Sequence, residues 1–89
     1  MVSETFVIGG AGLRSRQAEK MVRTACKFAS RISVAHLSKT INAKSMMGVF
    51  SLEVAAGESV TVTAEGADEK QAMEAIRRLV NSELAQGAE

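Results

Sequence analysis

Apolar and polar side chains alternate in some parts of the chain and follow a helical period in others. Residues 5–8 are a short, apolar, β-prone run, and residues 60–64 alternate cleanly between apolar and polar, so both are predicted as strands. Residues 32–43 are also β-like and are expected to contain a turn near residues 37–39. The pattern therefore predicts two separate strands and, between them, a hairpin.

Other segments have helical spacing. The first helix is expected to begin at about residue 15, because apolar side chains recur there with the period of one buried helical face. The members of this face are Ala18, Met21, Val22, Ala25 and Ala29. A second, short helix is expected within residues 44–52, with Ser45 as its N-cap.

The last helix is expected after Gly66. Asp68 and Gln71 have the spacing of a capping box, in which the Asp68 carboxylate would accept a hydrogen bond from a free amide of the first turn. The apolar stripe of this helix consists of Ala72, Ile76, Leu79 and Val80.

The element order is therefore β-α-β-β-α-β-α. Strands interleaved with amphipathic helices predict an α+β fold, an open-faced sandwich in which three helices cover one face of a four-stranded antiparallel sheet. Residues 1–84 are expected to form a single domain, and residues 85–89 a flexible C-terminal tail.

Composition excludes several classes of protein. The chain has 89 residues, of which 46% are hydrophobic and 24% charged, as in a globular domain. The single cysteine, Cys26, excludes an internal disulfide framework and a thiolate-rich metal site. No apolar run approaches the ~20 residues that a membrane helix needs, and the free thiol and the absence of a signal-like start favour a cytoplasmic protein.

A glycine-rich segment, residues 9–12, connects the first strand to the first helix. It lacks the spacing of a dinucleotide-binding motif, because Ser15 stands where a third glycine is needed, and no P-loop lysine follows. A connecting loop is therefore favoured over a nucleotide site. Its backbone amides at the helix N-terminus are still suited to an anion.

A basic stripe is predicted along the first helix. Its members are Arg16, Lys20, Arg23, Lys27 and Arg31, and Arg14 lies just before them. The stripe is either a solvated helix face or a surface for an acidic protein, a phosphate or a nucleic acid. The net charge of +1 and the scarcity of aromatic residues argue against direct nucleic-acid binding.

The short helix combines a predicted cap with an excess of apolar side chains. A phosphate on Ser45 would be stabilised by the positive end of the helix dipole. The apolar members beside it are Met46, Met47, Val49 and Phe50. Two turns of helix cannot bury all of them, so some are expected in the core and others in a contact surface.

His36 is the only histidine of the chain. It has no Asp, Glu or Cys at ligand or triad spacing, so it is predicted to be a structural or surface residue. No carboxylate pair, metal cluster or nucleophile-histidine set is evident, so the sequence predicts no enzyme, no metal and no cofactor.

The arrangement resembles the HPr phosphocarrier proteins of the bacterial phosphoenolpyruvate-dependent sugar phosphotransferase system, from about residue 6 to residue 84. Residues 42–52, with the sequence Asn-Ala-Lys-Ser-Met-Met-Gly-Val-Phe-Ser-Leu, are similar to the family's regulatory-serine motif, and residues 66–69 match the segment before its last helix. The resemblance implies the open-faced sandwich and a regulatory phosphorylation site at Ser45.

The family's active-site segment reads Gly, an apolar residue, His, a small residue, Arg, Pro, Ala. Residues 12–18 here read Gly-Leu-Arg-Ser-Arg-Gln-Ala, so Arg14 stands in place of the phosphorylated histidine and Gln17 in place of the proline. A guanidinium stays protonated and has no lone pair for phosphoryl transfer. The resemblance thus implies a lost carrier function and a retained anion cradle made of Arg14, Ser15, Arg16 and Gln17.

The histidine-lacking Crh branch of the family is similar in this respect and keeps the serine motif. This likeness implies phosphorylation of Ser45 by HPr kinase/phosphorylase and binding to the carbon catabolite control repressor. The expected partner surface combines the basic residues Arg16, Lys20, Arg23 and Lys27 with Met46, Met47 and Phe50. Two alternatives remain open: a decoy that binds enzyme I or other phosphotransferase proteins, and a small anion- or nucleic-acid-binding domain.

Overall fold

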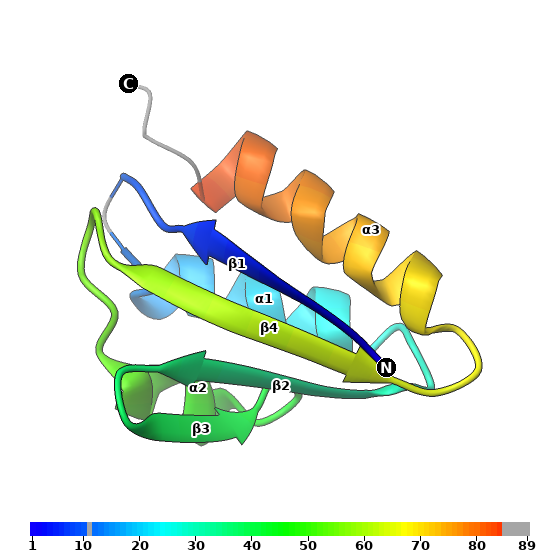
Figure 1. The fold of residues 1–89 in the computed structure, drawn as a ribbon. Helices are drawn as coiled ribbons and strands as arrows, with labels where there is room; N and C mark the ends of the chain where they lie inside the picture. Colours follow the sequence, from blue (N-terminus) through cyan, green and yellow to red (C-terminus); the bar gives the residue numbers. More distant parts are fainter. Residues whose placement is uncertain (11, 85–89) are drawn as a thin grey trace.

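The computed structural model describes residues 1–10 and 12–84 (Figure 1). Along the chain its elements are β1 (Val2–Val7), α1 (Ser15–Ala25), β2 (Arg31–His36), β3 (Lys39–Asn42), α2 (Met46–Leu52), β4 (Ser59–Glu65), α3 (Glu69–Leu79) and the π-helical turn η1 (Val80–Leu84). The predicted order of strands and helices is confirmed. The tail predicted over residues 85–89 lies outside the described residues.

The four strands form one antiparallel sheet in the order β1-β4-β2-β3. All three helices lie on the same face of this sheet, behind it in Figure 1, which confirms the predicted open-faced sandwich. The hairpin between β2 and β3 closes through two residues, since His36 pairs with Lys39. The first of these, Leu37, has a φ of 57°, so the turn uses a left-handed residue without a glycine.

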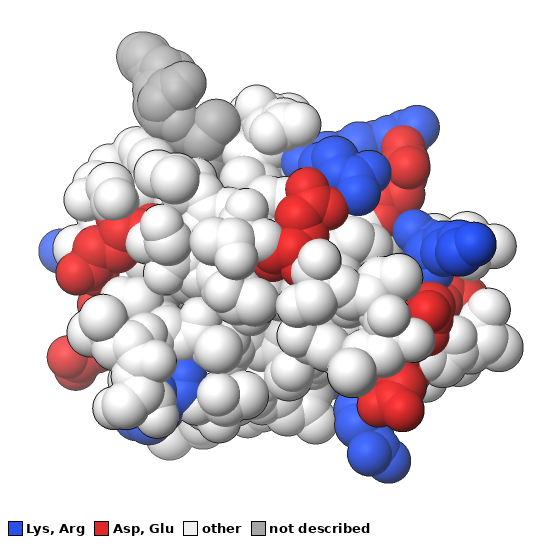
Figure 2. Space-filling view, viewed as in Figure 1, with Lys and Arg blue, Asp and Glu red and all other residues white. Residues whose placement is uncertain are grey.

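Alternation along the strands separates the core from the open face. Val60, Val62 and Ala64 of β4 point toward the helices and are at most 1% exposed. On the opposite face, hydroxyl groups pair across β1 and β4, with Ser3 Oγ 3.0 Å from Thr63 Oγ1 and Thr5 Oγ1 2.9 Å from Thr61 Oγ1. Figure 2 shows that this open face is largely uncharged and that charged side chains gather at its rim.

Two predicted boundaries were wrong. The first strand begins at Val2 rather than at residue 5 and ends at Val7, because β1 pairs with β4 along its whole length. The first helix ends at Ala25, so Ala29 is not part of its buried face but an exposed loop residue. The backbone amide of Ala29 donates to Asp68 Oδ2 at 2.9 Å, and this distant contact holds the loop.

The capping box predicted at Asp68 is also wrong. Asp68 is the N-cap residue of α3, but its side chain makes no capping hydrogen bond. Its carboxylate instead accepts from the backbone amide of Ser30, at 2.9 Å, and from the Ser30 hydroxyl. Glu69 satisfies the neighbouring turn, because its Oε1 accepts from the Gly66 amide at 3.0 Å. Asp68 therefore joins α3 to the loop before β2.

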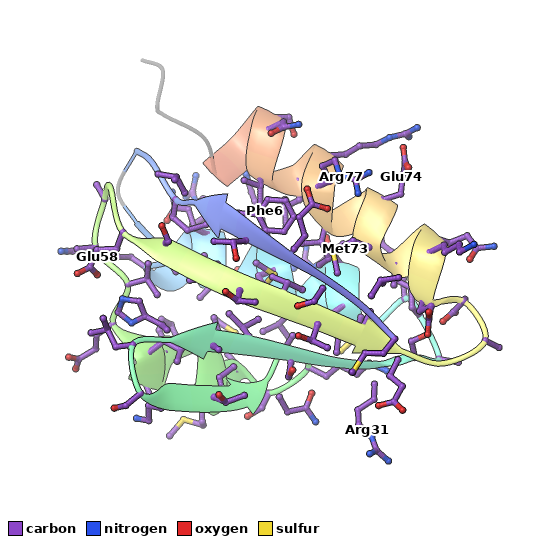
Figure 3. All side chains as sticks on the ribbon, in the orientation of Figure 1. Phe6, Arg31, Glu58, Met73, Glu74 and Arg77 are labelled. Carbon is purple, nitrogen blue, oxygen red and sulfur yellow. The ribbon has the colours of Figure 1, made fainter. Side chains whose placement is uncertain are left out.

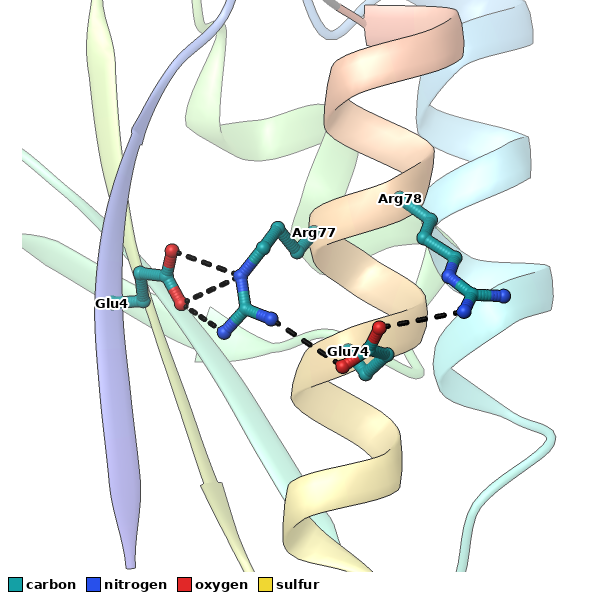
Figure 4. Close-up of polar contacts among 4 residues, drawn as sticks. All are labelled: Glu4, Glu74, Arg77 and Arg78. Carbon is teal, nitrogen blue, oxygen red and sulfur yellow. Dashed lines mark hydrogen bonds and ion pairs between the residues drawn. The ribbon is translucent and has the colours of Figure 1, made fainter.

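An ion-pair cluster joins the edge strand β1 to α3. Arg77 Nη2 lies 2.7 Å from Glu4 Oε1, and Glu74 pairs with both Arg77 and Arg78 (Figure 4). Beneath it, Phe6 and Met73 fill the space between strand and helix (Figure 3) and are 7% and 4% exposed. β1 is thus held in two ways. Its backbone pairs with β4, and its helix-facing side chains make apolar and ionic contacts with α3.

Candidate functional site

Gly12 brings the chain to the start of α1 through a conformation that favours glycine. Its φ is +78°, and a Cβ atom placed on it would lie 2.3 Å from the carbonyl oxygen of Val54. The next amide, that of Leu13, donates to this same carbonyl at 3.0 Å. The segment after α2 therefore sets the position of the loop that leads into α1.

The N-terminus of α1 is positive and has no side-chain cap. Arg14 is its N-cap residue, with extended backbone and no capping hydrogen bond, and no acidic residue occupies the first turn. Arg14 and Arg16 are exposed and Gln17 is half-buried. The side chain of Ser15 lies outside what the structure describes. Free amides, the helix dipole and two guanidinium groups together make this end of α1 attractive to an anion.

Ser45 caps α2 as predicted. Its hydroxyl oxygen accepts from the backbone amide of Gly48 at 3.0 Å, and the Ser45 side chain is only half-buried. The first turn of α2 contains no acidic residue. The hydroxyl therefore satisfies one amide at the N-terminal end of the helix, and its side chain stays partly exposed there.

The apolar residues of α2 divide between the core and the surface. Val49 is fully buried, and Met46 is partly buried and packs against the core. Met47 and Phe50 are 80% and 41% exposed. Met47 and Phe50 are thus the more exposed members of the predicted apolar contact surface, and Met46 is its partly buried member.

A pocket of about 450 Å³ joins the two candidate sites. It is lined by Leu13, Arg14, Phe50, Glu53, Val54 and Ala55. Arg14 of the predicted anion cradle and Phe50 of the contact surface thus face one depression. Sequence spacing did not reveal Glu53, which ends α2 in a left-handed conformation with φ 52° and adds the one carboxylate of this lining.

The predicted basic stripe is shorter than expected. Because α1 ends at Ala25, Lys27 lies in the following turn and Arg31 in β2, where it sits at the far end of the sheet from Glu58 (Figure 3). Arg23 forms an ion pair with Glu19 one helical turn away. The stripe is therefore no continuous row of five cations, which weakens the case for a nucleic-acid surface.

His36 is buried rather than on the surface. Only 6% of it is exposed, and both ring nitrogens contact oxygen atoms: Nδ1 lies 3.0 Å from the Leu52 carbonyl and Nε2 lies 3.0 Å from Glu58 Oε1. The Ala55 amide, and to a smaller extent His36, lower the pKa of the Glu58 carboxyl group. The predicted structural role of His36 agrees with these contacts, and its partner Glu58 was not foreseen.

Clustered metal ligands and membrane-spanning helices are both absent from the part of the chain that the structure describes. It contains no cluster of three or more His, Cys, Asp or Glu side chains suited to a metal ion. None of its helices is long and apolar enough to cross a membrane.

Comparison with known proteins identifies the family. The sequence matches the family described as the PTS HPr component phosphorylation site over residues 2–82. Among solved structures, it is 40% identical to HPr-C-His from Thermoanaerobacter tengcongensis, covering 99% of this chain and 100% of that one with a TM-score of 0.92. It is 36% identical to phosphocarrier protein HPr from Bacillus anthracis, covering 89% and 95% with a TM-score of 0.84.

A third relative is Crh, the catabolite repression protein of Bacillus subtilis, at 39% identity. The match covers 85% of this chain and 87% of Crh, with a TM-score of 0.73. The HPr relatives are named phosphocarrier proteins, which carry a phosphoryl group rather than catalyse a reaction, in agreement with the prediction that the protein is no enzyme. Fold, family motif and relatives agree, and the chain therefore belongs to the HPr family, the phosphocarrier proteins of the phosphotransferase system.

Proposed function

We propose that this protein is a regulatory member of the HPr family, controlled by phosphorylation of Ser45 rather than by phosphoryl transfer through a histidine. Ser45 would be modified by HPr kinase/phosphorylase, and the product would bind the carbon catabolite control repressor. The observation that carries the proposal is that two features occur in the same chain. Ser45 is a partly exposed cap of α2, and Arg14 stands at the N-terminus of α1.

Arg14 supports the loss of the carrier function. A phosphocarrier needs a nitrogen lone pair that accepts the phosphoryl group, and a guanidinium offers none at neutral pH. His36 is a poor substitute, because it is buried and both of its nitrogens already contact oxygen atoms. A phosphate or a carboxylate could still bind at α1, where Arg14 and Arg16 supply positive charge.

Ser45 supports the regulatory role. Its hydroxyl points at the amide of Gly48, so a phosphate in the same place would lie over the positive end of α2 and keep the cap satisfied. The new charge would stand beside Met47, which is 80% exposed. Phosphorylation would therefore change the charge of an apolar contact surface without unfolding the helix.

We further propose that the partner surface spans α2 and the start of α1. Phe50 and Arg14 line one pocket, which makes the two elements a continuous surface. Met47 and Phe50 would supply apolar contact, and Arg14, Arg16 and Lys20 would face acidic groups of the partner.

Intact-mass analysis after two incubations tests the proposal. With ATP and HPr kinase, we expect one added phosphate that maps to Ser45. With phosphoenolpyruvate and enzyme I, we expect none. Ser45→Ala should abolish the first labelling, whereas the control Ser51→Ala should retain it, since Ser51 is an exposed serine of the same helix whose hydroxyl donates to the Gly48 carbonyl. Labelling from phosphoenolpyruvate would contradict the proposal.

Arg14→His is the converse test. If Arg14 alone blocks the relay, this variant should gain phosphate from phosphoenolpyruvate and enzyme I, while Arg14→Gln should not. If Arg14→His stays unlabelled, Gln17 or the glycine-rich loop also prevents transfer.

A decoy role is a second candidate, favoured by the exposed Met47 and Phe50 and by the exposed Arg14 and Arg16 at the start of α1. A decoy would bind enzyme I and compete with a carrier HPr while gaining no phosphate from either donor. A titration of enzyme I activity with the unmodified protein separates the two roles, because only a decoy inhibits without ATP and kinase.

A further inference from the structure

His36 holds together segments that are far apart in the sequence. From the end of β2, its Nδ1 reaches the carbonyl of Leu52, the last residue of α2, and its Nε2 reaches Glu58, just before β4. Glu58 Oε1 also accepts from the Ala55 amide at 2.8 Å. The imidazole ring and one carboxylate thus fix both ends of residues 52–58.

The two oxygen atoms that contact the His36 ring determine how many protons the ring must carry to form both hydrogen bonds. A carbonyl oxygen and a carboxylate oxygen both accept hydrogen bonds, and a neutral imidazole carries only one N–H group. Two hydrogen bonds therefore require the imidazolium form, with a proton on each nitrogen. Loss of one proton would leave a lone pair facing an oxygen atom in a buried place.

The same segment supports the start of α1 from its other side. The Val54 carbonyl accepts from the Leu13 amide at 3.0 Å and leaves no room for a side chain on Gly12. Ile8 is attached as well, because its amide donates to the Glu58 carbonyl at 2.9 Å. A shift of residues 52–58 would therefore move the loop that positions Arg14.

We infer that His36 is a positioning residue for the N-terminus of α1, acting through residues 52–58, and that its protonation makes the anion cradle sensitive to pH. The inference deepens the proposed function and rests on it as far as the cradle binds an anion. Both contacts exist together only while each ring nitrogen carries a proton, so the cradle would respond when the ring gains or loses one. The imidazolium form, present at lower pH, is the form that holds the segment in the observed place.

Three charged residues lie on the segments that contact His36 or pair with it. Glu58 contacts the ring, and Glu53 follows the hydrogen-bonded Leu52 at the end of α2. Lys39 pairs with His36 across the hairpin, but its Nζ donates to the Ser51 carbonyl at 3.1 Å, at the end of α2. A proton gained by the ring is thus compensated directly by Glu58.

A titration of the intact protein between about pH 5 and pH 8, followed by two-dimensional NMR, tests the inference. Since His36 is the only histidine, its ring signals are unambiguous. We expect the backbone amide signals of Leu13, Arg14 and Val54 to shift with the same midpoint as the ring. In His36→Gln these amides should lose that shift, while the control Lys39→Gln should keep it.

Binding of inorganic phosphate, measured in the same titration, separates this inference from the proposed function. We expect phosphate affinity to fall about 2- to 10-fold as His36 loses its proton, the size expected for coupling through a few contacts. If the amide signals shift with the same midpoint as the His36 ring signals but no phosphate binds, the result would support positioning by His36 and contradict the anion cradle. If the amide signals do not shift together with the ring signals, the inference is overturned even if phosphate binds. The titration of the wild-type protein is sufficient to decide between these outcomes.

Discussion

Gly12 and Gly57 both adopt left-handed backbone conformations, but their surroundings differ. At Gly12 a Cβ atom would meet the Val54 carbonyl at 2.3 Å, whereas at Gly57 nothing lies within 4 Å of it. Strain from the backbone angle applies at both positions, and a steric clash applies only at Gly12. The close approach at Gly12 is thus what ties the glycine-rich loop to the segment after α2.

Gly12→Ala should lower the free energy of unfolding by about 2–4 kcal/mol, because it adds a clash to the backbone strain. Gly57→Ala, the matched control, should cost only about 1 kcal/mol. Urea unfolding of both variants measures the difference. Equal losses would show that Val54 moves away at little cost.

Asp68 is expected to make stability depend on acid pH. The Ser30 hydroxyl, and next the Ala29 amide, lower the pKa of the Asp68 carboxyl group below its ordinary value. A depressed pKa in the folded state stabilises the fold above the ordinary pKa of aspartate, and this stabilisation is lost as pH falls through the folded pKa.

Asp68→Asn should therefore reduce the thermal midpoint at neutral pH, and its difference from the wild type should shrink below about pH 4. Glu65→Gln is a suitable control, since Glu65 is exposed at the end of β4. Thermal unfolding at several pH values measures both. A difference that persists unchanged in acid would contradict the role of the ionised carboxylate.

Contacts between elements explain why the edge strand β1 stays in place. The guanidinium of Arg77 forms hydrogen bonds with both carboxylate oxygens of Glu4, using Nε and Nη2. This contact holds the pKa of the Glu4 carboxyl group below its ordinary value. A charged residue on the inner side of an edge strand also discourages pairing with another chain.

The pair Glu4→Gln and Arg77→Gln should behave non-additively in a double-mutant cycle, because each change removes the same contact. The coupling should weaken in about 1 M salt, since both side chains are partly exposed to solvent. Arg78→Gln, whose guanidinium pairs only with Glu74 among the ion pairs of the described residues, should show no coupling to Glu4. Additive losses for the first pair would mean that the contact contributes nothing to holding β1.

At the scale of the whole molecule, the packing of helices on the sheet buries some methionine side chains and leaves others exposed. Met21 of α1 is fully buried between helix and sheet, whereas Met47 of α2 is 80% exposed. Burial of an apolar side chain stabilises the fold, and exposure of one leaves it free for a partner. Met21 thus contributes to the stability of the fold, whereas Met47 belongs to the proposed partner surface.

Met21→Ala should lower the free energy of unfolding by about 2–5 kcal/mol, because it leaves a cavity in the core. Met47→Ala should change it by no more than about 0.5 kcal/mol and should weaken binding of the phosphorylated protein to the repressor about tenfold. Urea unfolding and a binding titration measure the two effects. A Met47→Ala protein that binds as well as the wild type would remove Met47 from the partner surface.

Local sequence patterns determined the types and the order of the elements, and they identified the Ser45 cap, because caps and periodicity depend on residues within a few positions of each other. Only the tertiary structure decided the extent of β1, the partners of Asp68 and the two contacts of His36. Each of these depends on groups from distant segments that meet only when the sheet is assembled. The proposed anion cradle depends on both: its charged residues are evident in the sequence, whereas the position of the loop before them depends on the Val54 carbonyl across the fold.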